Sequence, residues 1–215
     1  MSTEQAALLV LGTRDFSVEV ADVAEQSGFR VAGFVENLAR ERCADCIEGL
    51  PIHWIDDLDE LAATHLAVCG LGTTRRGIFT EQAAEHGLRF ATVVHPTAAV
   101  SRTSIIGEGA ILFPGTIVGA RTELGAHVLV NRGALVGHHT VLGDYVSVMS
   151  GANVAGSCWI GERTYVGMGA VVIDHVSVGS GSVVGAGAVV TKDVPDRVEV
   201  VGVPARIVKE GIEPR

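Results

Sequence analysis

His138, the first of two adjacent histidines, could move a proton, and Gly156 follows a short distance downstream. An imidazole exchanges a proton near neutral pH and is the commonest general base in enzymes. A glycine N–H can donate a hydrogen bond to a developing oxyanion. A base beside such a donor suits acyl transfer if the fold brings the two together. The alternative is that His138 is a solvated turn residue, as we expect for His127 and His175.

A repeat of six residues determines where these groups lie. An aliphatic residue returns at every sixth position over nearly half the chain, and a small or β-branched residue usually follows four positions later. The aliphatic positions are Val94, Val100, Ile106, Leu112, Val118, Leu124, Val130, Val136, Leu142, Val148, Val154, Ile160, Val166, Val172, Val178, Val184 and Val190. This period predicts a parallel β-helix with three hexads in each triangular coil. A sandwich of Val-rich strands would instead show turn signals in a shifting register.

The repeat also predicts how each coil is packed. The aliphatic side chain points into the prism, and the small one shares that interior without overpacking it. A glycine often follows the aliphatic residue directly, and we expect it to serve a turn whose backbone conformation a Cβ would resist. No long insertion breaks the count between Val94 and Val190.

The same count places His138 and Gly156 in one column. Gly156 comes three hexads after His138, which is one whole coil, so the two should stack about 5 Å apart. Asp174 and Lys192 continue the column. Because His138 follows the inward Val136 by two residues, it should lie near a turn and face outward.

The part of the chain before the repeat alternates strands and helices and predicts a small parallel α/β unit. The expected strands are 6–11, 29–35, 65–69 and 89–94, and the expected helices are 15–26 and 75–86. Asp15 or Ser17 can cap the first helix, and Gly28 can end it. Ligands of such sheets bind at the carboxyl ends of the strands, here the loops 12–15, 36–37 and 70–75.

These loops differ in what they could hold. The loop at Gly12 is not a Gly-x-Gly-x-x-Gly loop, which argues against a full dinucleotide site. The segment from Gly70 to Arg75 is better suited to bring backbone N–H groups and a guanidinium to a phosphate. An ordinary glycine turn before a helix is an equal alternative for that segment.

The composition limits the classes of function. The formal net charge of −9 argues against nucleic acids and anionic membranes, which need a basic face. A pocket for an anionic ligand would rely mostly on arginine, because Lys192 and Lys209 are the only lysines. No apolar stretch is long enough to span a membrane, and residues 1–7 carry Glu4 but no lysine or arginine, unlike a secretory signal. We therefore expect a soluble, cytoplasmic protein of one or two domains without membrane insertion.

The four cysteines do not suggest a disulfide framework. Cys158 falls on an inward small position of the repeat, and Cys69 ends a predicted buried strand. Cys43 and Cys46 have the spacing of half a zinc site, with His53 a further candidate ligand, but a second pair is missing. Plain loop cysteines are therefore the favoured interpretation, and no metal is expected.

Four features follow one another: the α/β unit, a His-Pro-x-Ala junction at 95–98, the hexapeptide helix and a Gly-Val-Pro-Ala-Arg segment at 202–206. Together they resemble the sialic-acid O-acetyltransferase-like family, and within it the nucleotide-linked aminosugar N-acetyltransferases of the bacillosamine and perosamine pathways. The hexads alone would indicate only a left-handed β-helix acyltransferase or a relative. The fold that the resemblance implies is mainly β, a left-handed parallel β-helix with a small N-terminal Rossmann-like α/β domain.

The resemblance implies how the chain is divided and assembled. Residues 1–94 would bind the sugar nucleotide, residues 95–194 would form the acyltransferase β-helix, and residues 195–215 would pack along the coils near CoA. It implies a homotrimer with acetyl-CoA between adjacent β-helices. The implied reaction is direct N-acetylation of a nucleotide-linked amino sugar, with O-acetylation of a sugar hydroxyl as the alternative.

The resemblance also implies roles for particular residues. His138 matches the family's general base, and Gly156 matches the N–H that polarises the thioester carbonyl. Asn131 matches a residue that contacts the sugar, and the other expected substrate contacts are Gly12, Thr13, Arg14, Glu36, Asn37, Gly72, Thr73, Arg75 and His139. The expected CoA contacts are Gly156, Gly167, Met168, Gly185, Ala186, Pro204 and Arg206.

Several positions depart from the family pattern. The family usually places Asp or Glu directly after the base, where this chain has His139, and often a second histidine where it has Ser147. The imidazole of His138 would then need an orienting group from elsewhere, and Asp144 and Asp174 are the available carboxylates. The loops 12–15 and 36–37 also differ from the family's Gly-rich stretch and acidic pair.

Two other functions fit the scaffold less well. A β-helical carbonic anhydrase needs three histidines around zinc, and His127, His138, His139 and His175 lack its His-x₄-His spacing. That function would also leave the N-terminal unit unexplained. A non-catalytic binding protein would result if the changes at His139 and Ser147 had silenced the site.

Overall fold

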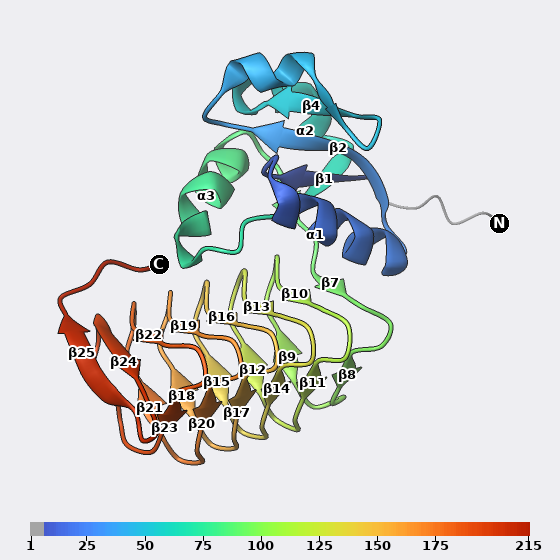
Figure 1. The fold of residues 1–215 in the computed structure, drawn as a ribbon. Coiled ribbons are helices and arrows are strands. Elements are labelled where there is room, and N and C mark those ends of the chain that lie inside the picture. Colours follow the sequence, from blue (N-terminus) through green and yellow to red (C-terminus); the bar gives the residue numbers. More distant parts are fainter. Residues whose placement is uncertain (1–6) are drawn as a thin grey trace. The chain divides into compact units, whose positions relative to one another are not determined.

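The computed structural model describes residues 7–215 (Figure 1). It divides into two compact units, residues 7–72 with 76–95 and residues 73–75 with 96–215. Residues 1–6, which include Glu4 and the first residue of the predicted first strand, lie outside the described residues. No helix within residues 7–215 is long and apolar enough to cross a membrane.

The first unit contains a six-stranded sheet in the order β3-β4-β2-β1-β5-β6, which is parallel except for the β3–β4 hairpin. Its strands are β1 (Ala7–Leu11), β2 (Arg30–Glu36), β3 (Cys46–Ile47), β4 (Leu50–Trp54), β5 (His65–Cys69) and β6 (Arg89–Phe90), with β7 (Val93–Val94) following. Its helices are α1 (Asp15–Gln26), α2 (Asp59–Ala62) and α3 (Gly77–Glu85), and short 3₁₀ segments lie at Arg40–Ala44, Ile55–Asp57 and Thr74–Arg76. The apolar β1 is fully buried from Leu8 to Leu11, as expected for a central parallel strand.

The predicted strands and helices of this unit are present, the short helix α2 is an additional element that was not predicted, and three further features differ. The hairpin β3–β4 was not predicted, because two short strands around Gly49 and Pro51 carry little periodicity. The predicted cap of α1 was wrong: Arg14 occupies the N-cap without a side-chain hydrogen bond, and the Ser17 hydroxyl donates to the Gly70 carbonyl at 3.2 Å. The predicted 89–94 strand is interrupted between β6 and β7.

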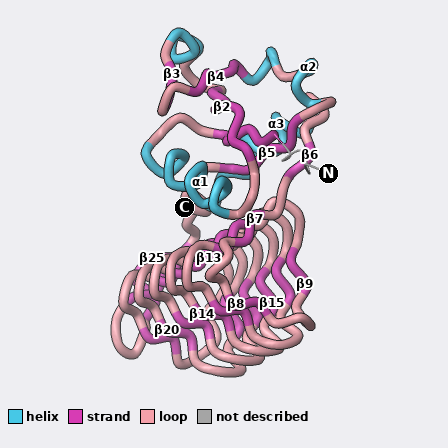
Figure 2. Tube along the Cα trace, turned by 90° about the vertical axis from the view of Figure 1, so that its right-hand side faces the viewer, coloured by secondary structure: helices cyan, strands magenta, loops and turns pink. Residues whose placement is uncertain are grey.

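The second unit is a parallel β-helix in which each coil adds a short strand to each of three sheets, as Figure 2 shows by its alternation of strand and turn. One sheet contains β8 (Ala99–Val100), β11 (Ile117–Val118), β14 (Leu135–Val136), β17 (Asn153–Val154), β20 (Val171–Val172) and β23 (Val189–Val190). The next contains β9 (Ile105–Ile106), β12 (Glu123–Leu124), β15 (Val141–Leu142), β18 (Trp159–Ile160) and β21 (Ser177–Val178). The third contains β10 (Ile111–Leu112), β13 (Leu129–Val130), β16 (Ser147–Val148), β19 (Tyr165–Val166), β22 (Val183–Val184), β24 (Val198–Val201) and β25 (Arg206–Glu210). The predicted left-handed parallel β-helix is confirmed.

The prism interior is filled as the repeat predicts. From Leu112 to Val190 the aliphatic positions are at most 2% exposed, and the small positions Ala110, Thr116 and Thr122 are fully buried. Val100 and Ile106 are only half-buried, because β8 and β9 are the terminal strands of their sheets. The core of this unit is therefore a continuous stack of aliphatic layers. This stack sets the position of each turn along the axis of the prism.

The glycines that directly follow the aliphatic residues have a different role from the predicted one. None of them has a positive φ. Instead, a Cβ on Gly143 would lie only 2.6 Å from the backbone nitrogen of Glu162 on the next coil. The left-handed conformation occurs two residues later, at Tyr145 and at the equivalent position of other coils. Close stacking of the coils, rather than a special backbone conformation, therefore requires these glycines.

Gly143→Ala should lower the free energy of unfolding by about 3 kcal/mol, because the added methyl meets backbone that cannot rotate away. Gly151→Ala is the matched control: Gly151 has a φ of 68° and open space around its Cβ position, so only about 1–2 kcal/mol of backbone strain should result. Urea denaturation at equal protein concentration measures both. Equal losses in the two variants would contradict the close-approach explanation.

The segment after the last hexad packs on the end of the coils. β24 extends the third sheet in parallel with β22, and β25 returns antiparallel to β24, with Val201 opposite Arg206. The Ile212 N–H then donates to the Arg197 carbonyl at 2.9 Å. The Arg215 guanidinium lies 4.4 Å from the centre of the Tyr165 ring, so the chain runs back along the coils.

Candidate functional site

His138 and Gly156 lie on neighbouring coils at one corner of the prism, as predicted. Pairing of β14 with β17 sets Val136 beside Val154, and the Ser157 N–H donates to the His138 carbonyl at 2.8 Å. A Cβ placed on Gly156 would lie 2.7 Å from Cε1 and 2.9 Å from Nε2 of His138. The imidazole therefore rests against the Gly156 backbone, in a space that only glycine leaves open. We call the turns after β11, β14, β17 and β20 the His138 corner.

The backbone N–H of Gly156 differs from its neighbours in its hydrogen bonding. It has no acceptor among the described residues, whereas the flanking Ala155 and Ser157 donate to Val172 and His138. Both His138 and its neighbour His139 are exposed at the surface of the chain. The corner thus presents a proton acceptor and a hydrogen-bond donor side by side, which is what acyl transfer requires.

The polar partner of the His138 ring is His139. Their Nδ1 atoms are 3.0 Å apart, and the rings meet edge to face with their centres 5.2 Å apart. The expectation that Asp144 or Asp174 orients His138 was wrong. Asp144 lies at a different corner, after β15, where its carboxylate accepts the Ala126 N–H at 2.7 Å. Asp174 lies at the same corner as His138 but one coil beyond Gly156, and its carboxylate is 3.8 Å from the His175 imidazole.

Asn131 and most expected CoA contacts lie at a second corner, formed by the turns after β10, β13, β16, β19 and β22, which we call the Asn131 corner. Asn131 is buried, and its Oδ1 accepts the Arg132 N–H at 2.7 Å and the Ser150 hydroxyl at 3.2 Å. Met168 is 57% exposed. The expected CoA contacts at this corner are Gly167, Met168, Gly185 and Ala186. A single prism therefore does not bring the Asn131 corner to the His138 corner.

The expected contacts Pro204 and Arg206 lie at the end of the prism. Arg206 begins β25, and its guanidinium donates to the Ala205 carbonyl at 2.8 Å. Together with Lys192 it lines a cavity of about 410 Å³, and Asp193 is the only acidic residue of the described chain in that lining.

The first unit has a pocket of about 100 Å³ at the carboxyl ends of β1 and β2. Its lining consists of Gly12, Thr13, Arg14, Glu36, Asn37, Leu38, Ala39, Arg42, Leu71 and Phe79. The predicted convergence of the loops 12–15, 36–37 and 70–75 is thus confirmed, with Leu71 as the contribution of the third loop. Gly72, Thr73 and Arg75 are not part of this lining. The N–H groups of Thr74 and Arg75 donate to the Arg215 carbonyl at 2.7 and 3.2 Å. Because they already have this acceptor, they are not available to a phosphate in this structure.

Glu36 carries a negative charge in this pocket, and several donors surround its carboxylate. Its carboxylate accepts the N–H groups of Asn37 and Leu38 at 3.0 and 2.8 Å, together with the Thr13 hydroxyl. The Arg42 guanidinium lies 3.6 Å from Oε2. Burial by itself would raise the pKa of Glu36, but these hydrogen bonds and Arg42 together hold the pKa below its ordinary value. The carboxylate is therefore ionised at neutral pH.

Sequence reasoning missed Arg42. It lies in the Arg40–Ala44 segment before the unpredicted hairpin and donates to the Thr13 hydroxyl at 2.8 Å. Recognising that hairpin, which pairs β4 with β2, would have placed the segment beside Glu36.

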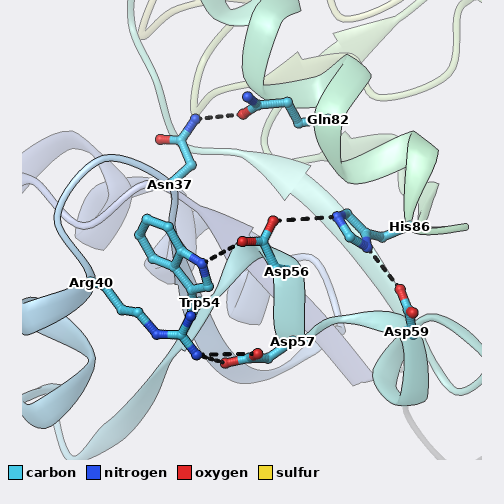
Figure 3. Close-up of polar contacts among 8 residues, drawn as sticks. All are labelled: Asn37, Arg40, Trp54, Asp56, Asp57, Asp59, Gln82 and His86. Atoms are coloured by element: carbon cyan, nitrogen blue, oxygen red, sulfur yellow. Dashed lines mark hydrogen bonds and ion pairs between the residues drawn. The ribbon is translucent and has the colours of Figure 1, made fainter.

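Side-chain hydrogen bonds and ion pairs connect the loops of the first unit near α3, as Figure 3 shows. The Asn37 side-chain amide donates to Gln82 on α3 at 2.7 Å, so its nitrogen is engaged within the protein. Nearby, the His86 imidazole lies 2.7 Å from Asp59 and 3.9 Å from Asp56. The Asn37 side chain thereby joins the loop after β2 to α3 at the edge of the pocket.

Comparison with known proteins places the chain among acyltransferases. The bacterial transferase hexapeptide family (six repeats) matches residues 139–173 and 157–192. No curated protein matches the chain. Perosamine N-acetyltransferase from Caulobacter crescentus, solved as a variant with CoA and GDP-perosamine, is 29% identical with a TM-score of 0.88 over 95% of this chain and 97% of that chain. The acetyltransferase domain of PglB from Neisseria gonorrhoeae, solved with acetyl coenzyme A, is 31% identical with a TM-score of 0.87 over 95% of this chain and all of that one.

The chain belongs to the hexapeptide-repeat acetyltransferase family of PglB and perosamine N-acetyltransferase. WeeI from Acinetobacter baumannii is also similar, at 28% identity and a TM-score of 0.84 over 94% of this chain and 99% of that one.

The cysteines of this acetyltransferase are free, and two are buried as predicted. Burial raises the pKa of the Cys69 thiol to about 11 and also raises that of Cys158. Cys43 lies half-buried in the Arg40–Ala44 segment, and Cys46 begins β3 and is exposed. Within residues 7–215, no group of three or more His, Cys, Asp or Glu side chains is arranged to hold a metal ion.

Of the two histidines expected in solvated turns, His175 is exposed but His127 is buried. His127 stacks on the Tyr145 ring with centres 5.1 Å apart, and the Arg163 guanidinium covers the other side of Tyr145 at 5.3 Å. These three residues follow one another on successive coils, so the repeat builds a ring stack there. The prediction for His127 was therefore wrong.

Glu36→Gln should destabilise this acetyltransferase at neutral pH, and the difference from the native protein should shrink under acid. A carboxyl whose pKa is lowered by folding contributes stability above its ordinary value of 4.5 and loses it as the pH falls through the lower folded value. Urea denaturation at pH 7 and at about pH 3 tests this, with Glu60→Gln on the exposed face of α2 as control. If Glu36→Gln and the native protein differ equally in free energy of unfolding at both pH values, folding does not lower the pKa of Glu36.

Proposed function

We propose that this acetyltransferase transfers the acetyl group of acetyl-CoA to the amine of a nucleotide-linked amino sugar. The observation that carries the proposal is the similarity, over 95% of the chain, to an enzyme structure that holds both CoA and GDP-perosamine. The exposed imidazole of His138 and the Gly156 N–H, which has no acceptor among the described residues, are the two kinds of group that direct acyl transfer uses.

In the proposed mechanism, His138 Nε2 takes a proton from the amine as its nitrogen attacks the thioester carbonyl. The Gly156 N–H donates to the oxygen that becomes negative. Its lack of an acceptor within the described residues supports this role, and loss of such a donor typically costs about 3–4 kcal/mol of transition-state stabilisation. The protonated imidazole can then return its proton to the departing thiolate, so that the enzyme ends unchanged.

The division of the site between two corners supports a homotrimer. Acetyl-CoA would lie between the His138 corner of one subunit and the Asn131 corner of the next, where the exposed Met168 offers apolar contact. Residues 195–215, including Pro204 and Arg206, would flank the same groove. The proposal predicts a trimer by sedimentation, and a monomer that is fully active would contradict it.

The N-terminal pocket would bind the sugar nucleotide. Thr13, Arg14 and Asn37 supply hydrogen-bonding groups, and the ionised Glu36 can accept hydrogen bonds but cannot donate them. Arg42 places a positive charge at the same pocket. It can balance part of the negative charge of a phosphate or of Glu36 itself. These residues are the proposed acceptor-binding set of residues 1–94.

The decisive experiment offers acetyl-CoA with a nucleotide-linked amino sugar and, separately, with its hydroxyl counterpart. Loss of the thioester should be followed by its ultraviolet absorbance rather than with a thiol reagent, because the exposed Cys46 would also react. Rapid consumption with the amine alone is expected. Transfer to the hydroxyl alone would replace the proposal by O-acetylation, and no transfer to any member of a panel of nucleotides would refute both.

A further inference from the structure

We propose that His139 is a positioning residue that fixes the tautomer of His138. It acts through the His138 ring and not by touching the substrate. The inference rests on the proposed function, because it concerns the same base. Its observation is the 3.0 Å approach of the two Nδ1 atoms, with the rings edge to face. At this distance one Nδ1 must donate a hydrogen and the other must accept it.

The direction of that hydrogen bond decides whether His138 is a base. When His138 carries its hydrogen on Nδ1 and donates it to His139, its Nε2 lone pair is open beside Gly156, and His139 carries its own hydrogen on Nε2. When the bond runs the other way, His138 carries its hydrogen on Nε2 and cannot take a proton there. Protonation of His139 enforces this second direction, because both of its nitrogens then donate.

The pair differs from an imidazole beside a carboxylate in one measurable respect. As His138 becomes a cation, a neutral His139 can still accept its Nδ1 hydrogen but adds no negative charge. A carboxylate in that place would stabilise the cation and raise the pKa of the base. The other charged groups of the same corner are Arg121 on the preceding coil and Asp174 and His175 on a later one, all exposed.

The backbone at His139 allows a clean test by substitution. Its φ is 56°, in the left-handed region that Asn and Asp adopt far more readily than most residues. Asn and Asp each carry a short side-chain acceptor oxygen, whereas Ala removes the acceptor. His175 occupies the equivalent position two coils later with a φ of 60° and does not contact His138, so His175→Ala carries the same backbone strain without the interaction.

The experiment compares kcat, KM for acetyl-CoA and the pH profile of the variants. His139→Ala should lose about 10- to 100-fold in kcat, a part of the 10²–10⁴-fold that a general base contributes, with little change in KM. His139→Asn should recover most of this loss. His139→Asp should also recover it, and its acidic limb should move to higher pH because the carboxylate stabilises the imidazolium. His175→Ala should resemble the native enzyme.

A second readout does not need turnover. Nitrogen NMR of the imidazoles at neutral pH should show His138 mainly with its hydrogen on Nδ1 in the native protein, and a mixture of tautomers in His139→Ala. An unchanged tautomer in that variant, native kcat in that variant, or folded Asn and Asp variants without recovery would each overturn the proposal. Absence of any acetyl transfer by the native protein would instead refute the proposed function, while the NMR result still tests the pair.

Discussion

His138→Ala should lower kcat for acetyl transfer by about 10²- to 10⁴-fold, because the amine then loses its proton to water rather than to a fixed base. The affinity for acetyl-CoA should stay nearly unchanged, since the imidazole acts on the reacting amine and not on the CoA moiety. Steady-state kinetics with the preferred acceptor, together with calorimetric titration of CoA, measure the two quantities.

His175→Ala serves as the control here as well, since His175 is an exposed histidine at the same corner. It should retain native kcat. Native turnover in His138→Ala would remove this residue from the mechanism, and an equal loss in both variants would indicate damage to the corner rather than loss of a base.

Gly156→Ala should lower kcat by about 10²-fold while the protein stays folded. The added methyl would lie 2.7 Å from Cε1 of His138, so the ring must leave its position. A misplacement of about 1 Å can cost this much in rate. The stability loss should be small, because the methyl meets the end of a mobile side chain and not the backbone of the next coil. Kinetics and urea denaturation on the same preparation check both statements.

The double variant His138→Ala/Gly156→Ala separates the steric effect from other roles of Gly156. Once the ring is absent, the methyl at position 156 has nothing to displace. The double variant should therefore be about as slow as His138→Ala alone, and the two effects should not add. A further loss of about 10²-fold in the double variant would show that the methyl harms the site by another route, such as blocking the N–H donor.

The β-helix and the register of its site could be read from the sequence because a solenoid repeats one local rule. Once Val136 is inward, the height and corner of His138, Gly156 and Asp174 follow by counting hexads, and β14–β17 pairing confirms that count. The N-terminal crevice could be predicted for a similar reason, since parallel strands end on a common edge. The hairpin β3–β4 has no such regularity, and Arg42 was missed with it.

Other features depend on contacts that periodicity does not describe. The reason for the glycines after each aliphatic residue became clear only when the next coil's backbone was in place. The burial of His127 depends on the Tyr145 ring that stacks on it from the next coil.

Counting hexads was enough to predict a prism with an imidazole one coil from a glycine N–H, because an aliphatic residue at every sixth position gives each triangular coil eighteen residues. The contact of His139, and of neither expected aspartate, with that imidazole could be seen only in the folded chain. Ring orientation depends on a left-handed turn and on side-chain rotamers, and these are set by neighbours in space rather than by spacing along the chain.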